Sequence, residues 1–334
     1  MKNLRTLLFG ISPDEATFER RGFPACEERQ RLRLEEVGRT FLVGYHAVLD
    51  AENEEQLVEA LEKVDPELRG FAYEGSAMAL GLLDMLFPWR RDRWRSFTDG
   101  LASHHVYMMY VGLGWAMARM RRRAEGYLSK LDPLLGWLAL DGYGFHEGYF
   151  HWESTIRDRN VPARLTGYAL RAFDQGLGRS MWFVLGSDTL RIATTIESFH
   201  QRRHSDLWSG VGLAATYAGG VGVDALRELV ELSGEHYSSM AQGSAFATEA
   251  RRRAGNVTEH TILACRTITG LPAERAGGIT SFERDGLPYD GAQPAFEIWR
   301  RRIQSHFTQR SIGGSGSAQA DTSTITTMQG APTK

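Results

Sequence analysis

A tyrosine, a glutamate and a histidine lie four residues apart from one another in the segment 141–153. On a helix, Tyr143, Glu147 and His151 would share one face. Glu147 could then fix the tautomer of His151 or raise its basicity, as an orienting carboxylate does for a general base. Packing of a tyrosine-rich helix, with its polar groups satisfied internally, is the structural alternative. We treat Tyr143, Glu147 and His151 as candidate catalytic residues.

The same segment does not show the spacing of a common metal motif. His146 and His151 are five residues apart, about 140° around a helix, which differs from the HExxH pattern of zinc proteases. A metal site here would need ligands from other helices, such as Glu74 or the histidines at 104 and 105. The two cysteines form no CxxC pair. No metal site is therefore predicted, and the cofactor is left open.

A second polar cluster lies in the segment 171–182. Gln175 and Arg179 are four residues apart on one helical face, and Arg171 can reach Asp174 or Gln175. A buried aspartate with two arginines could bind a carboxylate or phosphate group in a bidentate manner. A structural ion-pair network is the alternative interpretation.

Three short glycine-containing matches occur in the same order in the two halves of the chain, which indicates an internal repeat. They pair Tyr110–Ala116 with Trp208–Ala214, Glu74–Gly75 with Gln175–Gly176, and Glu147–Gly148 with Gln242–Gly243, at offsets of 98, 101 and 95 residues. We predict a duplicated helical unit, about 70–155 and 171–250, arranged around a pseudo-two-fold axis. Coincidence in a chain rich in glycine and alanine is the alternative.

The two predicted copies differ in charge. The first has Glu74 and Glu147 where the second has Gln175 and Gln242, and an amide keeps the shape of the acid but cannot ionise. We therefore assign acid–base chemistry to the first copy. The candidate catalytic residues are Glu147, His151, Tyr143 and Glu74. The candidate substrate-binding residues are Arg179, Gln175, Asp174, Gln242, His146 and Trp182.

These residues are expected on helices throughout. Apolar residues recur at helical spacing, and no segment alternates with the period of a strand. Ser12-Pro13-Asp14-Glu15 has the form of a capping box that begins a helix, and Gly22 is placed to end it. Further helices are expected near 24–50, 53–64, 66–87, 100–124, 132–153, 165–185, 188–199, 204–218, 223–253, 257–269 and 292–309. The prediction is one all-α multi-helix bundle over 1–310, followed by a disordered tail over 311–334 that is rich in Gly, Ser and Thr.

Composition restricts the class of function further. The 334 residues carry 39 basic and 41 acidic side chains, without the basic excess of a general nucleic-acid binder. The most apolar stretch, 106–117, is shorter than the roughly 20 residues that cross a bilayer. The N-terminal apolar run is too short for a signal peptide. We expect a cytoplasmic protein that does not span the membrane, with attachment to a membrane surface left open.

Four segments resemble a bacterial domain-of-unknown-function family that is encoded beside the polyketide synthase in enediyne antibiotic gene clusters. They are 12–23, 141–150, 173–183 and 207–214, and the similarity extends in order over about residues 10–310. The resemblance implies a role in converting a linear polyene from the synthase into the enediyne core, alongside integral-membrane partners. It supplies no catalytic residues.

Two classes of function follow from these observations. In the first, an enzyme holds an apolar polyene or acyl intermediate between its two halves. Glu147, assisted by His151, would accept a proton there, and Arg179 would hold a polar end of the ligand. In the second, the protein is a non-catalytic carrier or assembly partner of an integral-membrane tailoring enzyme. A metal-dependent oxidative enzyme that uses His146, His151 and Glu74 is a third possibility.

Overall fold

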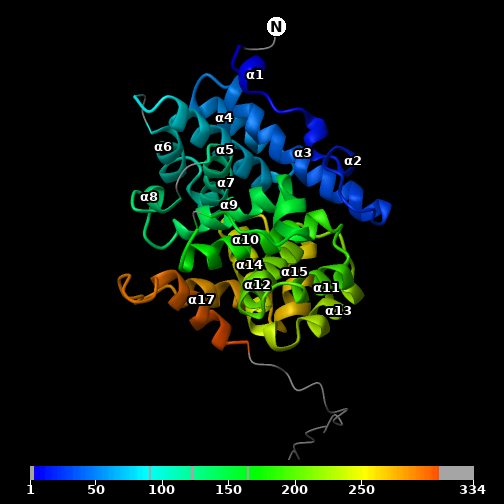
Figure 1. Ribbon diagram of the computed structural model, residues 1–334. Helices are drawn as coiled ribbons and strands as arrows, with labels where there is room; N and C mark the ends of the chain where they lie inside the picture. Colours follow the sequence, from blue (N-terminus) through cyan, green and yellow to red (C-terminus); the bar gives the residue numbers. More distant parts are fainter. Residues whose placement is uncertain (1–3, 90–91, 122–123, 164, 308–334) are drawn as a thin grey trace, which may run out of the picture.

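The computed structural model describes residues 4–89, 92–121, 124–163 and 165–307, and these contain helices and no strand, which confirms the all-α prediction. Seven long helices form a row in which each packs against the next (Figure 1). They are α3 (Glu28–Asp50), α5 (Arg69–Leu86), α7 (Val106–Arg119), α9 (Trp137–Phe150), α10 (Tyr168–Val184), α12 (Gln201–Tyr217) and α14 (Tyr237–Arg253). The tail predicted for 311–334 lies outside the described residues.

Shorter elements connect and flank this row. Before α3 lie α1 (Leu4–Phe9), the 3₁₀ turn η1 (Pro13–Ala16) and α2 (Phe18–Arg21). Within the row lie α4 (Glu54–Glu62), α6 (Arg93–Asp99), η2 (Ser103–His105), α8 (Ala124–Leu128), the π-helix η3 (Glu153–Arg157), α11 (Thr189–Glu197), α13 (Val223–Ser233) and η4 (Gly234–His236). After α14 lie α15 (Glu259–Thr269), α16 (Ala273–Phe282) and α17 (Ala295–Ser305). No described helix has both the length and the apolar character needed to cross a bilayer.

A glycine in each of the long helices α7, α9, α10, α12 and α14 lets the helices of the row approach closely. A Cβ at any of these glycines would overlap the backbone carbonyl oxygen of the preceding long helix, so no larger residue fits without a shift. The contacts are Gly112 with Glu74, Gly142 with Val111, Gly176 with Asp141, Gly210 with Gln175, and Gly243 with Ser209. In every case the oxygen belongs to the residue that directly precedes the glycine of the previous helix.

This regularity gives the row a period of 30 to 37 residues, about one third of the offsets seen in the sequence. Two of the three sequence matches, those at Gly75 and Gly112, join positions three helices apart. The third does not, because Gly148 packs against Ser180, whereas Asp141–Gly142 occupies the place in α9 that Gln242–Gly243 occupies in α14. The duplication of 70–155 in 171–250 stays a prediction.

Two expected helices are divided in the structure. Ser12 accepts a hydrogen bond from the Asp14 amide, but Thr17 has an extended backbone and caps a separate helix, which ends at Gly22 in the left-handed conformation as predicted. The helix expected over 223–253 breaks at Gly234, which has a φ of 49°. The short helices α1, α6, α8 and α16 were not anticipated.

Candidate functional site

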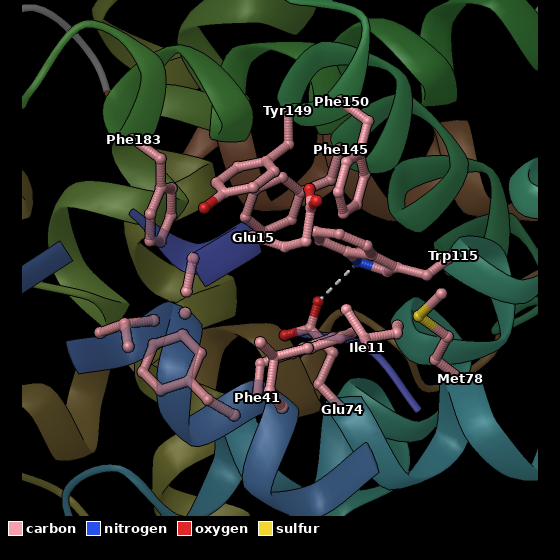
Figure 2. Close-up of a pocket in the computed structure, with 15 residues that line it drawn as sticks. Ile11, Glu15, Phe41, Glu74, Met78, Trp115, Phe145, Tyr149, Phe150 and Phe183 are labelled. Carbon is pink, nitrogen blue, oxygen red and sulfur yellow. Dashed lines mark hydrogen bonds between the residues drawn. The ribbon is translucent and has the colours of Figure 1, made fainter. Parts of the chain in front are cut away.

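An aromatic pocket lies between α3, α5, α7, α9 and α10, with the η1 segment across it (Figure 2). We call it the aromatic pocket. Its cavity has a volume of about 50 Å³. Two carboxylates line it beside the aromatic and aliphatic side chains, Glu74 from α5 and Glu15 from η1. The aromatic residues that line it are Phe41, Phe71, Trp115, Phe145, Tyr149, Phe150 and Phe183.

Glu74 is the most unusual group in this pocket. Its side chain is 1 % exposed, and Trp115 Nε1 donates a hydrogen bond of 2.9 Å to Oε1. Oε2 has no hydrogen-bond partner, and Arg179 Nη2 lies 4.0 Å from it. Burial raises the pKa of Glu74 to about 7, although Arg179 and Trp115 act in the opposite direction. Figure 2 shows this carboxyl group below the rings of Trp115, Phe145 and Tyr149.

Arg179 connects Glu74 to a second buried carboxylate, Asp141. The Arg179 guanidinium donates to Asp141 Oδ1, and Gln175 Nε2 donates to Asp141 Oδ2 at 2.8 Å. The guanidinium also lies over the ring of Phe145, 4.8 Å from its centroid. Two carboxylates therefore share one arginine, and Asp141 holds the direct hydrogen bond. Glu74 is left with weaker compensation for its charge, which fits its raised pKa.

The polar row continues through the later helices with amide and hydroxyl groups, and Arg300 of α17 contacts its end. Ser209 Oγ lies 3.2 Å from Gln175 Oε1 and 3.0 Å from Gln242 Oε1. Arg300 Nε donates to the same Gln242 oxygen at 3.2 Å. Gln175 and Gln242 were predicted to bind substrate, and the structure places both inside this buried hydrogen-bonded row. The carboxyl groups of the row are thus those of Glu74 and Asp141.

The helix face predicted from the sequence lines a different cavity. Tyr143, His146, Glu147 and His151 all border a wide cleft of about 900 Å³. The proposed pairing of Glu147 with His151 is wrong. α9 ends at Phe150, and His151 leaves the helical conformation with a φ of −125°. Glu147 Oε1 lies instead 3.1 Å from Nδ1 of His146.

The residues of the polar cluster predicted at 171–182 do not form one site, because they bind different partners. Asp174 pairs with Arg203, whose Nε lies 2.9 Å from Oδ2, and it is not placed beside Arg179. Arg171 binds Asp206 and Glu297 rather than Asp174 or Gln175. The fully buried Trp182 donates from Nε1 to the Gly219 carbonyl oxygen at 2.9 Å, which anchors the end of α12.

Sequence comparison then places the chain among known proteins. A family model described as "Protein of unknown function (DUF1702)" matches residues 1–307. The chain belongs to this family. A search of curated proteins and a search of solved structures each find no match. The DUF1702 description names no activity, so the geometry of the site carries the functional argument.

One residue of the candidate site, Asp141, was assigned no role from the sequence. Asp141 begins the segment that was singled out, but its partner Arg179 lies 38 residues away on another helix. The position of Asp141 directly before Gly142 was the available signal, since Glu74, Gln175 and Gln242 also precede such glycines. Among the described residues, no group of three or more His, Cys, Asp or Glu side chains is arranged to hold a metal ion.

Proposed function

We propose that this DUF1702 protein binds and processes a linear polyene made by an enediyne-type polyketide synthase. The aromatic pocket would hold part of the conjugated chain against Glu74. The observation that carries the proposal is the unpartnered Oε2 atom of Glu74, a carboxyl with a pKa of about 7 in a pocket lined by aromatic rings. The resemblance of four segments to the enediyne-cluster family supplies the identity of the polyene.

The chemistry that Glu74 offers is proton exchange. A carboxyl with a pKa near 7 is present in both protonation states at neutral pH, so it can act as a general acid or a general base. Donating a proton to one carbon of a conjugated chain and removing one from another carbon would move a double bond. Such a step returns Glu74 to its starting state and transfers no net electrons.

Ligand entry requires the aromatic pocket to widen. Its volume of about 50 Å³ is smaller than the roughly 150 Å³ cavity that accepts benzene in another protein. The η1 turn contributes Glu15 and Ala16 to the lining, Ile11 lies just before it, and Glu15 forms ion pairs with Arg20 and Arg21. Within the proposal, displacement of this segment admits the chain.

Two matched variants test the assignment. The full chain is incubated with polyene released from the synthase, and conversion is followed by absorbance and chromatography. Glu74→Gln keeps the shape of the side chain but cannot exchange a proton, so conversion should fall by at least about 100-fold, the usual contribution of a general acid or base. Glu147→Gln, which alters the carboxyl favoured by the sequence, should retain conversion.

The binding step is measured separately with diphenylhexatriene, an uncharged conjugated hydrocarbon whose fluorescence rises in an apolar site. Glu74→Gln should bind this probe as the natural chain does. Full conversion by Glu74→Gln would remove Glu74 from the mechanism, and loss only in Glu147→Gln would move the chemistry to the wide cleft.

A second candidate function is a non-catalytic carrier or assembly partner of an integral-membrane enzyme. The exposed leucines of α1 favour it, because Leu7 and Leu8 are 72 % and 64 % exposed and could meet another apolar surface. The same pair of variants discriminates the two functions. A carrier would convert no polyene alone, and it would support product formation by the membrane enzyme equally well with Glu74→Gln and Glu147→Gln.

A further inference from the structure

The wide cleft beside α9 has an excess of positive charge. We call it the arginine cleft. Arg21, Arg119 and Arg121 line it, and Glu147 is the one carboxylate among the described lining residues. Phe150 lines both this cleft and the aromatic pocket, so the two cavities are neighbours. At about 900 Å³ the cleft has the size of a small-molecule site.

Arg119 and Arg21 retain capacity to bind an anion. Arg119 is exposed and forms no ion pair with any described residue, although its place in the last turn of α7 also suits the helix dipole. Arg21 pairs with Glu15, yet its buried Nε atom has no hydrogen-bond partner. A guanidinium group presents parallel N–H donors that match the oxygens of carboxylate and phosphate.

His146 adds a hydrogen-bond acceptor to the same cleft. The side chain is 4 % exposed, and Nδ1 lies 3.1 Å from the Glu147 carboxylate. Because the carboxylate accepts the Nδ1 proton, Nε2 of the neutral ring is an acceptor, and burial lowers the pKa of His146 and favours that neutral form. Nε2 is buried without any partner, which is unfavourable for a polar atom.

The backbone around the cleft is also unusual. η3, which contributes Ser154 and Thr155 to the lining, is a π-helix, a rare element that is frequent at functional sites. Arg121 has a φ of 48°, and Arg159, next to the lining residue Asn160, has a φ of 59°. These are two of the three non-glycine residues with positive φ in the described chain. Such strained conformations gather at binding sites.

We infer that the arginine cleft binds an oxyanion that carries a hydroxyl group, with Arg119 and Arg21 holding the oxyanion and His146 Nε2 accepting the hydroxyl proton in a hydrogen bond. A hydroxycarboxylate and a hydrogen phosphate both have this chemistry. The site is separate from the Glu74 carboxyl, and it stands whether or not the aromatic pocket processes a polyene.

Calorimetric titration of the full chain with three probes tests the inference. Inorganic phosphate and 3-hydroxybutyrate each supply an oxyanion and a hydroxyl group, whereas butyrate lacks the hydroxyl. Saturable binding is expected for phosphate or 3-hydroxybutyrate, and which of them binds identifies the source of the oxyanion. Arg119→Gln should weaken that binding about tenfold, the loss of one hydrogen bond to a charged group.

Arg266→Gln is the matched control, because Arg266 is an exposed arginine of α15 that does not line the cleft. It should bind the probes as the natural chain does. His146→Gln, checked for folding by circular dichroism, should reduce the preference for 3-hydroxybutyrate over butyrate. Absence of saturable binding by all three probes, or equal weakening by Arg266→Gln, would overturn the site. Equal affinity of the natural chain for butyrate and 3-hydroxybutyrate would overturn the hydrogen bond to His146.

Discussion

Two buried clusters of charged side chains differ in how completely their charges are matched. In the Glu74 cluster, two carboxylates share one arginine. In the Glu297 cluster, two carboxylates meet two buried or half-buried arginines. The Glu74 cluster consists of Glu74, Asp141 and Arg179, and the Glu297 cluster consists of Asp206, Glu297, Arg171 and Arg300.

Hydrogen bonding follows the same division. Each carboxyl oxygen of Asp206 and Glu297 accepts at least one hydrogen bond, including 2.7 Å from Arg300 to Asp206 and 3.0 Å from the Tyr168 hydroxyl to Glu297. Glu74 Oε2 accepts none, and Glu74 borders a cavity. A carboxyl oxygen that has no hydrogen-bond partner and borders a cavity is available to a ligand. A carboxylate whose two oxygens both accept hydrogen bonds from the protein stabilises the fold instead. This difference separates a candidate site from a structural network.

The largest expected effect tests the structural role of the Glu297 cluster. Arg300→Gln leaves Asp206 buried with part of its compensation removed, so the free energy of unfolding should fall by about 3–5 kcal/mol. Urea denaturation measures the change. Arg301→Gln is the control, because Arg301 is 57 % exposed and pairs with the same Glu297. That variant should lose less than about 1 kcal/mol. Similar losses in both variants would contradict the comparison.

The next effect concerns the pH dependence of stability at Glu74. The folded chain holds the Glu74 proton up to a pH of about 7, whereas the unfolded chain releases it near pH 4.5. The stabilising contribution of the protonated group is therefore complete below pH 4.5 and is lost as the pH rises to about 7. Relative to Glu74→Gln, the free energy of unfolding of the natural chain should fall by about 3 kcal/mol over that interval.

Urea denaturation of both chains between pH 4 and pH 8.5 provides the measurement. Glu74→Gln is the control for the other titrating groups, because the two chains differ only at Glu74. Parallel curves across the interval would show that Glu74 is compensated like the carboxylates of the Glu297 cluster.

The smallest expected effect tests the hydrogen bond from Trp115 to Glu74. Trp115→Phe removes the hydrogen bond to Oε1, which favours the ionised form, so the pKa of Glu74 should rise further. Loss of about 1.4 kcal/mol would move the midpoint of the pH-dependent decline upward by roughly one pH unit. The same pH series detects the shift. A midpoint that stays in place or moves downward would show that Trp115 does not stabilise the carboxylate.

Much of the fold follows from the sequence, because helices depend on local signals. Apolar spacing and caps located the long helices, and the left-handed Gly22 appears where predicted. The break at Gly234 was missed because a mid-chain glycine is tolerated in many helices. The short α6 and α8 lack a long apolar period, so their stability comes from contacts with the rest of the chain.

The site was predictable only in part, because side-chain pairing across helices is not local. Glu74, Gln175 and Arg179 were singled out, and the structure brings them together: Arg179 lies beside Glu74, and both Arg179 and Gln175 donate to Asp141. The pairing with His151 failed at the end of α9, where one residue outside the helix changes the direction of the side chain.

The close glycine contacts described for the long helices fix the spacing of the backbone independently of the side chains beside them. The residues that directly precede those glycines are diverse in chemistry: Glu74, Val111, Asp141, Gln175, Ser209 and Gln242. The equivalent positions of these long helices therefore accept an acid, an amide, a hydroxyl or an aliphatic side chain. Single substitutions there are a route by which the interior can acquire a new ligand preference without a new fold.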